Sequence, residues 1–244
     1  MKAAPEIQAR LLDLQALDTK LTQLARRESQ LSERQVLEEA TARRDAIRAD
    51  VASTTDALED LQAELRRAED DVQVVEARIA RDQERMLSTS SAKDALGFEH
   101  EIETLRRRRG DLEEIQLVLM ERVEEHETAL AALTASLEEA SAAVTAAEQA
   151  VAEAMAEIRS SRDEATRQRA AIAVGIPEEL LALYEKQRAR YGIGASHLRR
   201  GISEASGVAL LADEMELVRR AAPDDVIICP QSSAILVRTA ESGL

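Results

Sequence analysis

The sequence predicts a mainly α fold: a long antiparallel two-helix coiled-coil hairpin that carries a small C-terminal α+β domain. Three observations predict it. Apolar residues recur at alternating spacings of three and four along two long stretches, and a short polar segment separates these stretches. Aromatic residues make up only 1% of the chain. Because compact cores draw much of their buried area from aromatic rings, this composition favours long helices.

Charge and composition exclude several classes of protein. The formal net charge of −15 gives the chain little to gain from approaching phosphate backbones. Residues 1–13 lack the apolar core of a signal peptide, and no run approaches a membrane span. The single cysteine, Cys229, excludes an internal disulfide framework. We therefore expect a cytoplasmic protein without a membrane partner.

The first apolar stretch extends from Leu14 to Met86. Its regular positions include Leu17, Leu21, Leu24, Leu31, Ile47, Val51, Leu58, Leu61, Leu65, Val72, Val75 and Ile79. A repeat of 3.5 residues keeps one seam of the helix against a partner helix. The repeat changes frame between Leu31 and Ile47, where we expect a local unwinding and no helix end.

The second apolar stretch keeps the same alternation from Ile102 to Ile158. Residues 88–94 lie between the two stretches and read Ser-Thr-Ser-Ser-Ala-Lys-Asp. Ser and Thr cap new helices, and Ser91 followed by Asp94 approximates a capping box. Residues 1–175 therefore predict a hairpin with a turn near 88–95. A parallel dimer of one continuous helix would leave the turn unexplained.

Two registers fit the heptads. A turn centred on Ala92 pairs residues whose numbers sum to 184, such as Ile79 with Leu105. A shift of one heptad, to a sum of 191, would pair Asp82 with Arg109 but needs a longer tip loop. We expect the first register. Association of two hairpins into a homo-oligomer is left open.

Two residues near the turn are candidates for partner binding. Phe98, the only phenylalanine, either caps the end of the hairpin or forms a partner-binding tip together with Lys93. The basic run at 106–109 is not a one-sided patch, because four consecutive helical residues point in four directions.

The C-terminal region, residues 176–244, predicts shorter elements. Pro177 suits the first position of a new helix, which would extend to Arg190. A hairpin around 197–210, a helix near 212–221 and strands at 226–228 and 235–237 follow.

Several segments together carry a resemblance that covers essentially the whole chain. They are residues 11–18 (Leu-Leu-Asp-Leu-Gln-Ala-Leu-Asp), Ala92-Lys93 with 101–105, 183–185 (Leu-Tyr-Glu), 221–226, Cys229 and 235–239. In these segments the chain resembles bacterial proteins with a coiled-coil hairpin and a C-terminal C4-type zinc ribbon, often described as predicted nucleic-acid binders. The resemblance implies a zinc-ribbon-like terminal domain and an association with nucleic acid.

The ribbon motif itself departs from that family. The family pattern is CxxC, a spacer and a second CxxC, which places the four ligand positions at Ser203, Ser206, Cys229 and Ser232. The glycine that commonly follows the last ligand is Ser233 here. A serine hydroxyl is too weak an acid and too hard a donor for structural zinc. We therefore expect a degenerate ribbon with no zinc and no other cofactor.

The chain also lacks the residues of a catalytic site. A nucleophilic serine needs an adjacent base held by a third group, and His197 is the only histidine of the C-terminal region. No G-x-S-x-G turn or phosphate-binding glycine loop is present. We therefore expect a protein that is not an enzyme.

Three functional hypotheses follow. The first is a scaffold or adaptor that presents the coiled-coil tip and the terminal domain to protein partners of unknown identity. The second is a nucleic-acid-associated factor, related to transcription or RNA and weakened by the lost metal site. Its candidate contacts are Arg199, Arg200, Arg219, Arg220 and Arg238. The third is a degenerate paralogue that kept the rod and lost the function of the ribbon.

Overall fold

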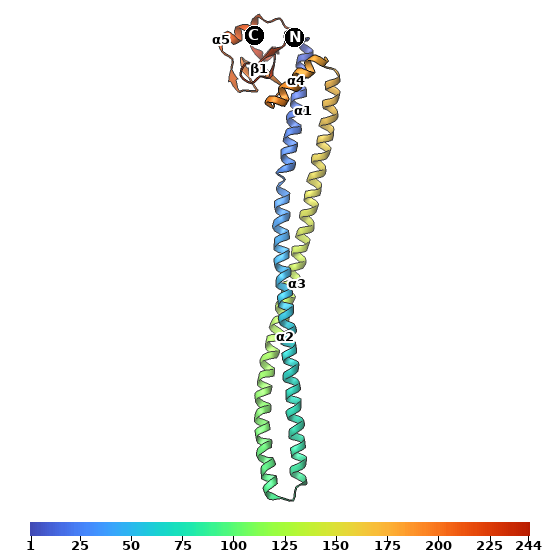
Figure 1. The fold of residues 1–244 in the computed structure, drawn as a ribbon, viewed down its shortest axis with the longest axis vertical. Helices are drawn as coiled ribbons and strands as arrows, with labels where there is room; N and C mark the ends of the chain where they lie inside the picture. Colours follow the sequence, from blue (N-terminus) through green and yellow to red (C-terminus); the bar gives the residue numbers. More distant parts are fainter. The chain divides into compact units, whose positions relative to one another are not determined.

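The computed structural model describes residues 1–244, and the chain divides into two compact units. Unit 1 contains residues 1–32 and 150–244, and unit 2 contains residues 33–149. Helix α2 (Ser32–Ser88) and helix α3 (Ala92–Val174) form a long helical hairpin, and a small domain with strands follows it (Figure 1). The predicted fold class is therefore confirmed. The predicted domain boundary at residue 175 falls inside unit 1.

Unit 2 consists of two antiparallel helical segments joined by residues 89–91 (Figure 1). Two apolar clusters fill the seam between them. One contains Leu61, Leu65, Ala68, Leu119 and Val123, and the other contains Val75, Ile79, Met86, Ile102, Leu105 and Leu112. Heptad side chains from both helices thus pack into one seam, as the 3.5-residue repeat predicts.

The ion pairs of unit 2 distinguish the two registers. Arg109 contacts Glu76 at 3.8 Å between Nη1 and Oε1, close to the register whose paired numbers sum to 184. The shifted register would have placed Arg109 beside Asp82, which instead pairs with Arg78 and Arg85. The contacts therefore agree with the expected register.

The first helical stretch is interrupted in unit 1, which corrects the expected continuous helix. Helix α1 (Pro5–Ser29) ends before α2 begins at Ser32. Gln30 leaves helical geometry with φ −116° and ψ 35°, and Leu31 is buried against Ala154 and Ile158 of α3. Burial of Leu31 offsets the cost of the break. Residues 32–35, Ser-Glu-Arg-Gln, also carry the pattern of a capping box.

The terminal domain of unit 1 matches the expected order of elements. Helix α4 (Glu178–Tyr191) is followed by β1 (Ala195–Arg199), β2 (Ile202–Ser203), β3 (Val208–Ala209), helix α5 (Ala212–Arg220), β4 (Ile227–Ile228), β5 (Ile235–Val237) and the 3₁₀ turn η1 (Ala240–Ser242). The strand order is β3-β2-β1-β5-β4, in which only the β1–β5 pair is parallel.

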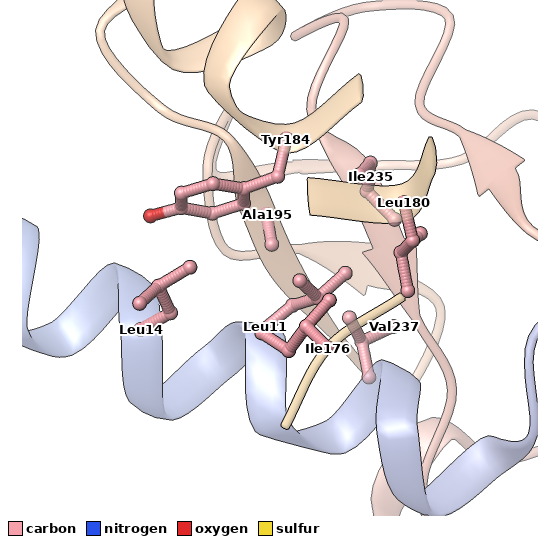
Figure 2. Close-up of a cluster of buried hydrophobic side chains, with 8 residues drawn as sticks. All are labelled: Leu11, Leu14, Ile176, Leu180, Tyr184, Ala195, Ile235 and Val237. Atoms are coloured by element: carbon pink, nitrogen blue, oxygen red, sulfur yellow. The ribbon is translucent and has the colours of Figure 1, made fainter. Parts of the chain in front are cut away.

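The terminal domain is attached to the helices by a shared core. Leucines of α1 pack against residues around α4 and against the parallel strands β1 and β5 (Figure 2). The residues of this core are Leu11, Leu14, Ile176, Leu180, Tyr184, Ala195, Ile235 and Val237. A second core within the terminal domain contains Leu198, Leu210, Val218, Cys229 and Leu236. None of the helices combines the length and apolar character that a bilayer crossing requires.

Candidate functional site

The turn of the hairpin in unit 2 is held by side chain to backbone hydrogen bonds. The N–H of Asp94 donates to the hydroxyl of Ser91 at 3.3 Å, which satisfies one free donor at the start of α3. The N–H of Ser91 donates to the hydroxyl of Thr89 at 3.3 Å. The polar turn residues therefore fix a short connection.

The structure brings Lys93 and Phe98 into one groove beside this turn. The groove has a volume of about 820 Å³ and is open to solvent. Its lining residues are Arg78, Asp82, Arg85, Ser88, Thr89, Lys93, Asp94, Gly97, Phe98 and Glu101. Lys93 is exposed and Phe98 is half-buried. The groove thus combines one aromatic ring with charges of both signs.

Two leucines at the turn were missed by the sequence analysis. Leu87 is 84% exposed and Leu96 is 66% exposed, so both present apolar surface to solvent next to the groove residues Ser88 and Gly97. Neither follows the heptad spacing that places Ile79 and Met86 in the seam. An apolar residue that is off the seam and beside a turn is the sequence signal that could have identified them.

The four residues at the expected ribbon-ligand positions, Ser203, Ser206, Cys229 and Ser232, lie in two equivalent turns of the terminal domain. In the first turn, residues 203–207, the N–H of Gly207 donates to the carbonyl of Ser203 at 2.8 Å. In the second turn, residues 229–233, the N–H of Ser233 donates to the carbonyl of Cys229 at 2.9 Å. The residue that closes each turn has a left-handed backbone, with φ 66° at Gly207 and φ 60° at Ser233.

The two turns lie against each other. The hydroxyl of Ser206 donates to Oε1 of Gln231 at 3.3 Å. Burial raises the pKa of the Cys229 thiol, but hydrogen bonds from Ser232 and Ser203 outweigh burial, and the resulting pKa is lower than usual. The sequence-predicted positions are therefore brought together in space, with Cys229 and Ser203 fully buried.

The donor atoms in these turns do not fit a structural zinc ion. One thiol and three hydroxyls replace the four thiolates or imidazoles that tetrahedral zinc requires. No group of three or more His, Cys, Asp or Glu side chains in the structure is arranged to hold a metal. The Nε2 of His197 contacts the hydroxyl of Thr239 at 2.5 Å, so this nitrogen is already engaged within the domain.

A second groove, lined mainly by apolar side chains, lies on the terminal domain beside α5. Its volume is about 380 Å³. The residues that line it are Leu210, Glu214, Leu217, Val218, Ala221, Val226, Ile227, Ile228, Pro230 and Leu236. Leu217 and Ile228 are exposed at its rim. The terminal domain therefore presents an apolar surface of its own.

The candidate nucleic-acid contacts have different environments. Arg238 donates hydrogen bonds to five backbone carbonyls, those of Val218, Ala221, Ala222, Pro223 and Asp225. Arg199 pairs with Glu204 at 3.2 Å and with Glu241 at 2.8 Å, and Arg220 pairs with Glu216 at 3.0 Å.

Only two of these arginines, Arg200 and Arg219, are exposed without an ion pair. Arg238 was a further candidate contact, and its guanidinium is engaged with carbonyls in the last turn of α5 and in the segment that follows it.

A buried polar network joins α1, α3 and α4, and sequence reasoning did not predict it. Asp18 is buried and accepts two hydrogen bonds from Arg169, at 2.7 and 3.1 Å, while Arg188 lies 3.3 Å away. Glu185 in turn pairs with Arg169 and Arg188. The partner atoms lie 151 residues apart along the chain, so no local pattern marks the pair.

Comparisons with known proteins agree with this geometry. Residues 14–192 match the CT398-like coiled coil hairpin domain. The chain is 35% identical over 241 residues to the uncharacterized protein Rv2229c of Mycobacterium tuberculosis, with 98% of each chain covered. A solved structure from Mycobacterium smegmatis is 36% identical, with a TM-score of 0.83 over 98% of this chain and 100% of that one.

The structure of CT398 from Chlamydia trachomatis is 21% identical and shares the fold, with a TM-score of 0.63 over 95% of this chain and 97% of that one. The family match covers the seam of the hairpin, the tip groove and helix α4. The chain therefore belongs to the family of the CT398-like coiled coil hairpin domain.

Proposed function

We propose that this protein is a non-enzymatic adaptor whose hairpin tip binds a protein partner. The observation that carries the proposal is the apolar surface at the turn. Leu87 and Leu96 are exposed beside a groove that holds Phe98. Exposed apolar groups that gather at one place are typical of protein-binding surfaces. A hairpin whose only task was to hold its own seam would gain nothing from these two leucines.

The charges around the groove support a protein partner. Arg78, Arg85 and Lys93 face the groove together with the carboxylates of Asp82, Asp94 and Glu101. A surface that binds phosphate backbones needs an excess of positive charge. Mixed charges around an apolar centre instead suit a protein surface with its own mixture of signs.

The terminal domain offers a second docking surface. The groove beside α5 is lined mainly by apolar side chains, and Leu217 lies exposed at its rim. An adaptor needs two surfaces that can be occupied independently. The tip belongs to unit 2 and the α5 groove to unit 1, so each surface is built within its own unit.

The absence of catalytic groups is part of the same proposal. Ser203 is buried and its hydroxyl lies 3.4 Å from that of Ser196, with no base beside it. The imidazole of His197 is engaged by Thr239. A nucleophile and a base that do not meet cannot support acyl transfer.

We further propose that the terminal domain is a zinc-ribbon-like fold that has lost its metal and is held by the core around Cys229. Loss of three thiolates supports this proposal, and so does the apolar cluster that contains Leu198, Val218 and Leu236. A single buried cysteine is also consistent with the cytoplasm as the compartment. The nucleic-acid alternative has less support, because Arg199, Arg220 and Arg238 are engaged within the domain.

Affinity capture tests the adaptor proposal. The tagged protein is captured from its own cells with and without nuclease, and a Leu87→Ser/Leu96→Ser variant is compared with Val36→Ser, which changes an exposed apolar residue elsewhere in unit 2. We expect the tip variant to lose partners that survive nuclease, and Val36→Ser to keep them. Partners that the tip variant retains, or that nuclease removes, would refute the proposal.

A further inference from the structure

One outer face of α3 in unit 2 carries apolar residues that no part of the chain covers. Ile115 is 52% exposed and Val118 is 51% exposed. The next residue, Leu119, is buried in the seam. The spacing places Ile115 and Val118 on the same side of the helix, next to the seam. We call the set Arg108, Asp111, Ile115, Val118, Arg122 and Glu125 the outer stripe.

The charges of the outer stripe have no partners within the chain. Arg108, Asp111, Arg122 and Glu125 are exposed, and none of them forms an ion pair. The neighbouring Arg109 behaves differently, because it pairs with Glu113 at 3.1 Å and with Glu76 at 3.8 Å. Four free charges therefore flank two free apolar residues at spacings of three and four.

The order of the signs makes the outer stripe complementary to itself. Along α3 the stripe reads positive, negative, apolar, apolar, positive, negative. Turned end for end, the same stripe presents negative, positive, apolar, apolar, negative, positive. We propose that the chain forms a dimer in which α3 packs antiparallel against α3 of a second copy through the outer stripe.

The register of this dimer follows from the pattern. Ile115 lies opposite Val118 of the second copy, Asp111 opposite Arg122, and Arg108 opposite Glu125. Since a two-fold axis relates the copies, each of these contacts occurs twice. Two apolar contacts are thus flanked on both sides by two pairs of opposite charges.

Two other pairings of the same helix lack this complementarity. A parallel arrangement would bring each charge of the stripe against its own copy. The opposite side of α3 also exposes two apolar residues, Leu117 and Met120. Antiparallel pairing of Leu117 with Met120 would place Glu113 against Glu124, which is repulsive. Of these three arrangements, only the antiparallel pairing of the outer stripe matches opposite charges on both sides of the apolar residues.

The size of the stripe sets the strength of association. It is about 26 Å long at 1.5 Å per residue. A contact of this length buries less area than a permanent dimer interface does. The dimer is therefore weak, forms at high protein concentration, and dissociates as salt screens the four ion pairs.

Charge variants of the full chain test the proposal by sedimentation equilibrium between about 5 μM and 500 μM protein at low salt. The average mass of the unmodified chain is expected to rise from 26.8 kDa toward twice that value. Asp111→Arg and Arg122→Asp each create two repulsive pairs, and each is expected to raise the dissociation constant by at least about ten-fold. Glu124→Arg changes the charge as much as Asp111→Arg does but on another side of α3, and it leaves association unchanged.

A mixture of the two single variants tests whether the specific facing pairs, and not the net charge of the chain, control association. When Asp111→Arg chains are mixed with Arg122→Asp chains, every facing pair again has opposite signs, so the mixture associates as the unmodified chain does. The double variant Asp111→Arg/Arg122→Asp recovers association for the same reason. Circular dichroism confirms that each variant keeps its helices.

Three results would overturn the proposal. The unmodified chain could remain at 26.8 kDa throughout the concentration range, which would exclude self-association through the stripe. Dimers that both single variants retain would place the interface elsewhere. A mixture that fails to associate, although both chains are folded, would exclude the antiparallel register.

Discussion

The hydroxyl of Tyr184 donates a hydrogen bond of 2.7 Å to Oδ2 of Asp18, and both side chains are buried. The bond joins α4 to α1 across 166 residues of sequence. The same hydroxyl oxygen lies 3.2 Å from Oε1 of Gln15, and Oε1 of Gln15 accepts a hydrogen bond from the N–H of Gly194 at 2.7 Å. One tyrosine therefore ties the first helix to the start of the strand-containing domain, and its ring contributes to the shared core (Figure 2).

Removal of the Tyr184 hydroxyl is expected to destabilise unit 1. In Tyr184→Phe the ring still fills the core, but the buried carboxylate of Asp18 loses one donor. We expect the free energy of unfolding to fall by about 1–2 kcal/mol. Urea denaturation followed by circular dichroism measures the change. Tyr191→Phe is the control, because Tyr191 is exposed, and an equal loss in both variants would contradict the prediction.

The ionisation of Tyr184 provides a test by pH. Burial raises its pKa, and the hydrogen bond to Asp18 raises it further. Because the pKa is higher in the folded state, the resulting stability is fully present below the unfolded pKa of about 10 and is lost as pH rises beyond it. In a Tyr191→Phe variant, Tyr184 is the only remaining tyrosine.

We expect the tyrosinate absorbance of that variant to appear only together with the loss of helical circular dichroism above pH 10. Absorbance that develops near pH 10 while the helices remain intact would show that Tyr184 is accessible to base.

Asp18 is expected to matter more than any exposed carboxylate of α1. Asp18→Asn replaces a carboxylate by a neutral amide of the same shape. It removes the negative charge that Arg169 and Arg188 share at Oδ1. Glu185 still pairs with both arginines, so the change removes charge-assisted hydrogen bonds without leaving either arginine unpaired, and we expect a loss of about 2 kcal/mol in unfolding free energy. Asp13→Asn is the matched control, since Asp13 is exposed on the same helix. Equal losses of unfolding free energy in the two variants would contradict a stabilising role of the buried network.

Much of the fold follows from local patterns in the sequence. The seam of unit 2 follows from the 3.5-residue repeat, because each position of a heptad has a fixed side of the helix. The turn at residues 89–91 lies within the predicted segment, because serine and threonine both interrupt and restart helices. The strands at 227–228 and 235–237 are short apolar runs bounded by turn residues, which is a local signal as well.

The features that sequence analysis missed depend on distant partners. The break after Ser29 is fixed by burial of Leu31 against Ala154 and Ile158, and propensity alone favoured a continuous helix. The pairing of Asp18 with Arg169 is chosen by the packing of three helices, and an acidic chain offers many other carboxylates to each arginine. Local rules could not select this pair.

The turns at residues 203–207 and 229–233 are expected to bind zinc when their three serines at the ligand positions are replaced by cysteine. The hydrogen bonds that close these turns are already present, although the turns lack four metal-binding thiols. They run from the N–H of Gly207 to the carbonyl of Ser203 and from the N–H of Ser233 to the carbonyl of Cys229. The triple change Ser203→Cys/Ser206→Cys/Ser232→Cys gives four thiols with Cys229. Thiols ionise on binding zinc, whereas serine hydroxyls do not.

We expect elemental analysis to find one zinc per chain in the triple variant and none in the unmodified protein. The double change Ser203→Cys/Ser206→Cys supplies three thiols and serves as the control, with weaker binding that a chelator removes first. Bound zinc should also raise the thermal stability of the terminal domain, since the ion binds only the folded arrangement. Zinc in the unmodified protein would refute the proposed loss of the metal site. A triple variant that folds but binds no zinc would show that the two turns do not place four thiols in a tetrahedral arrangement.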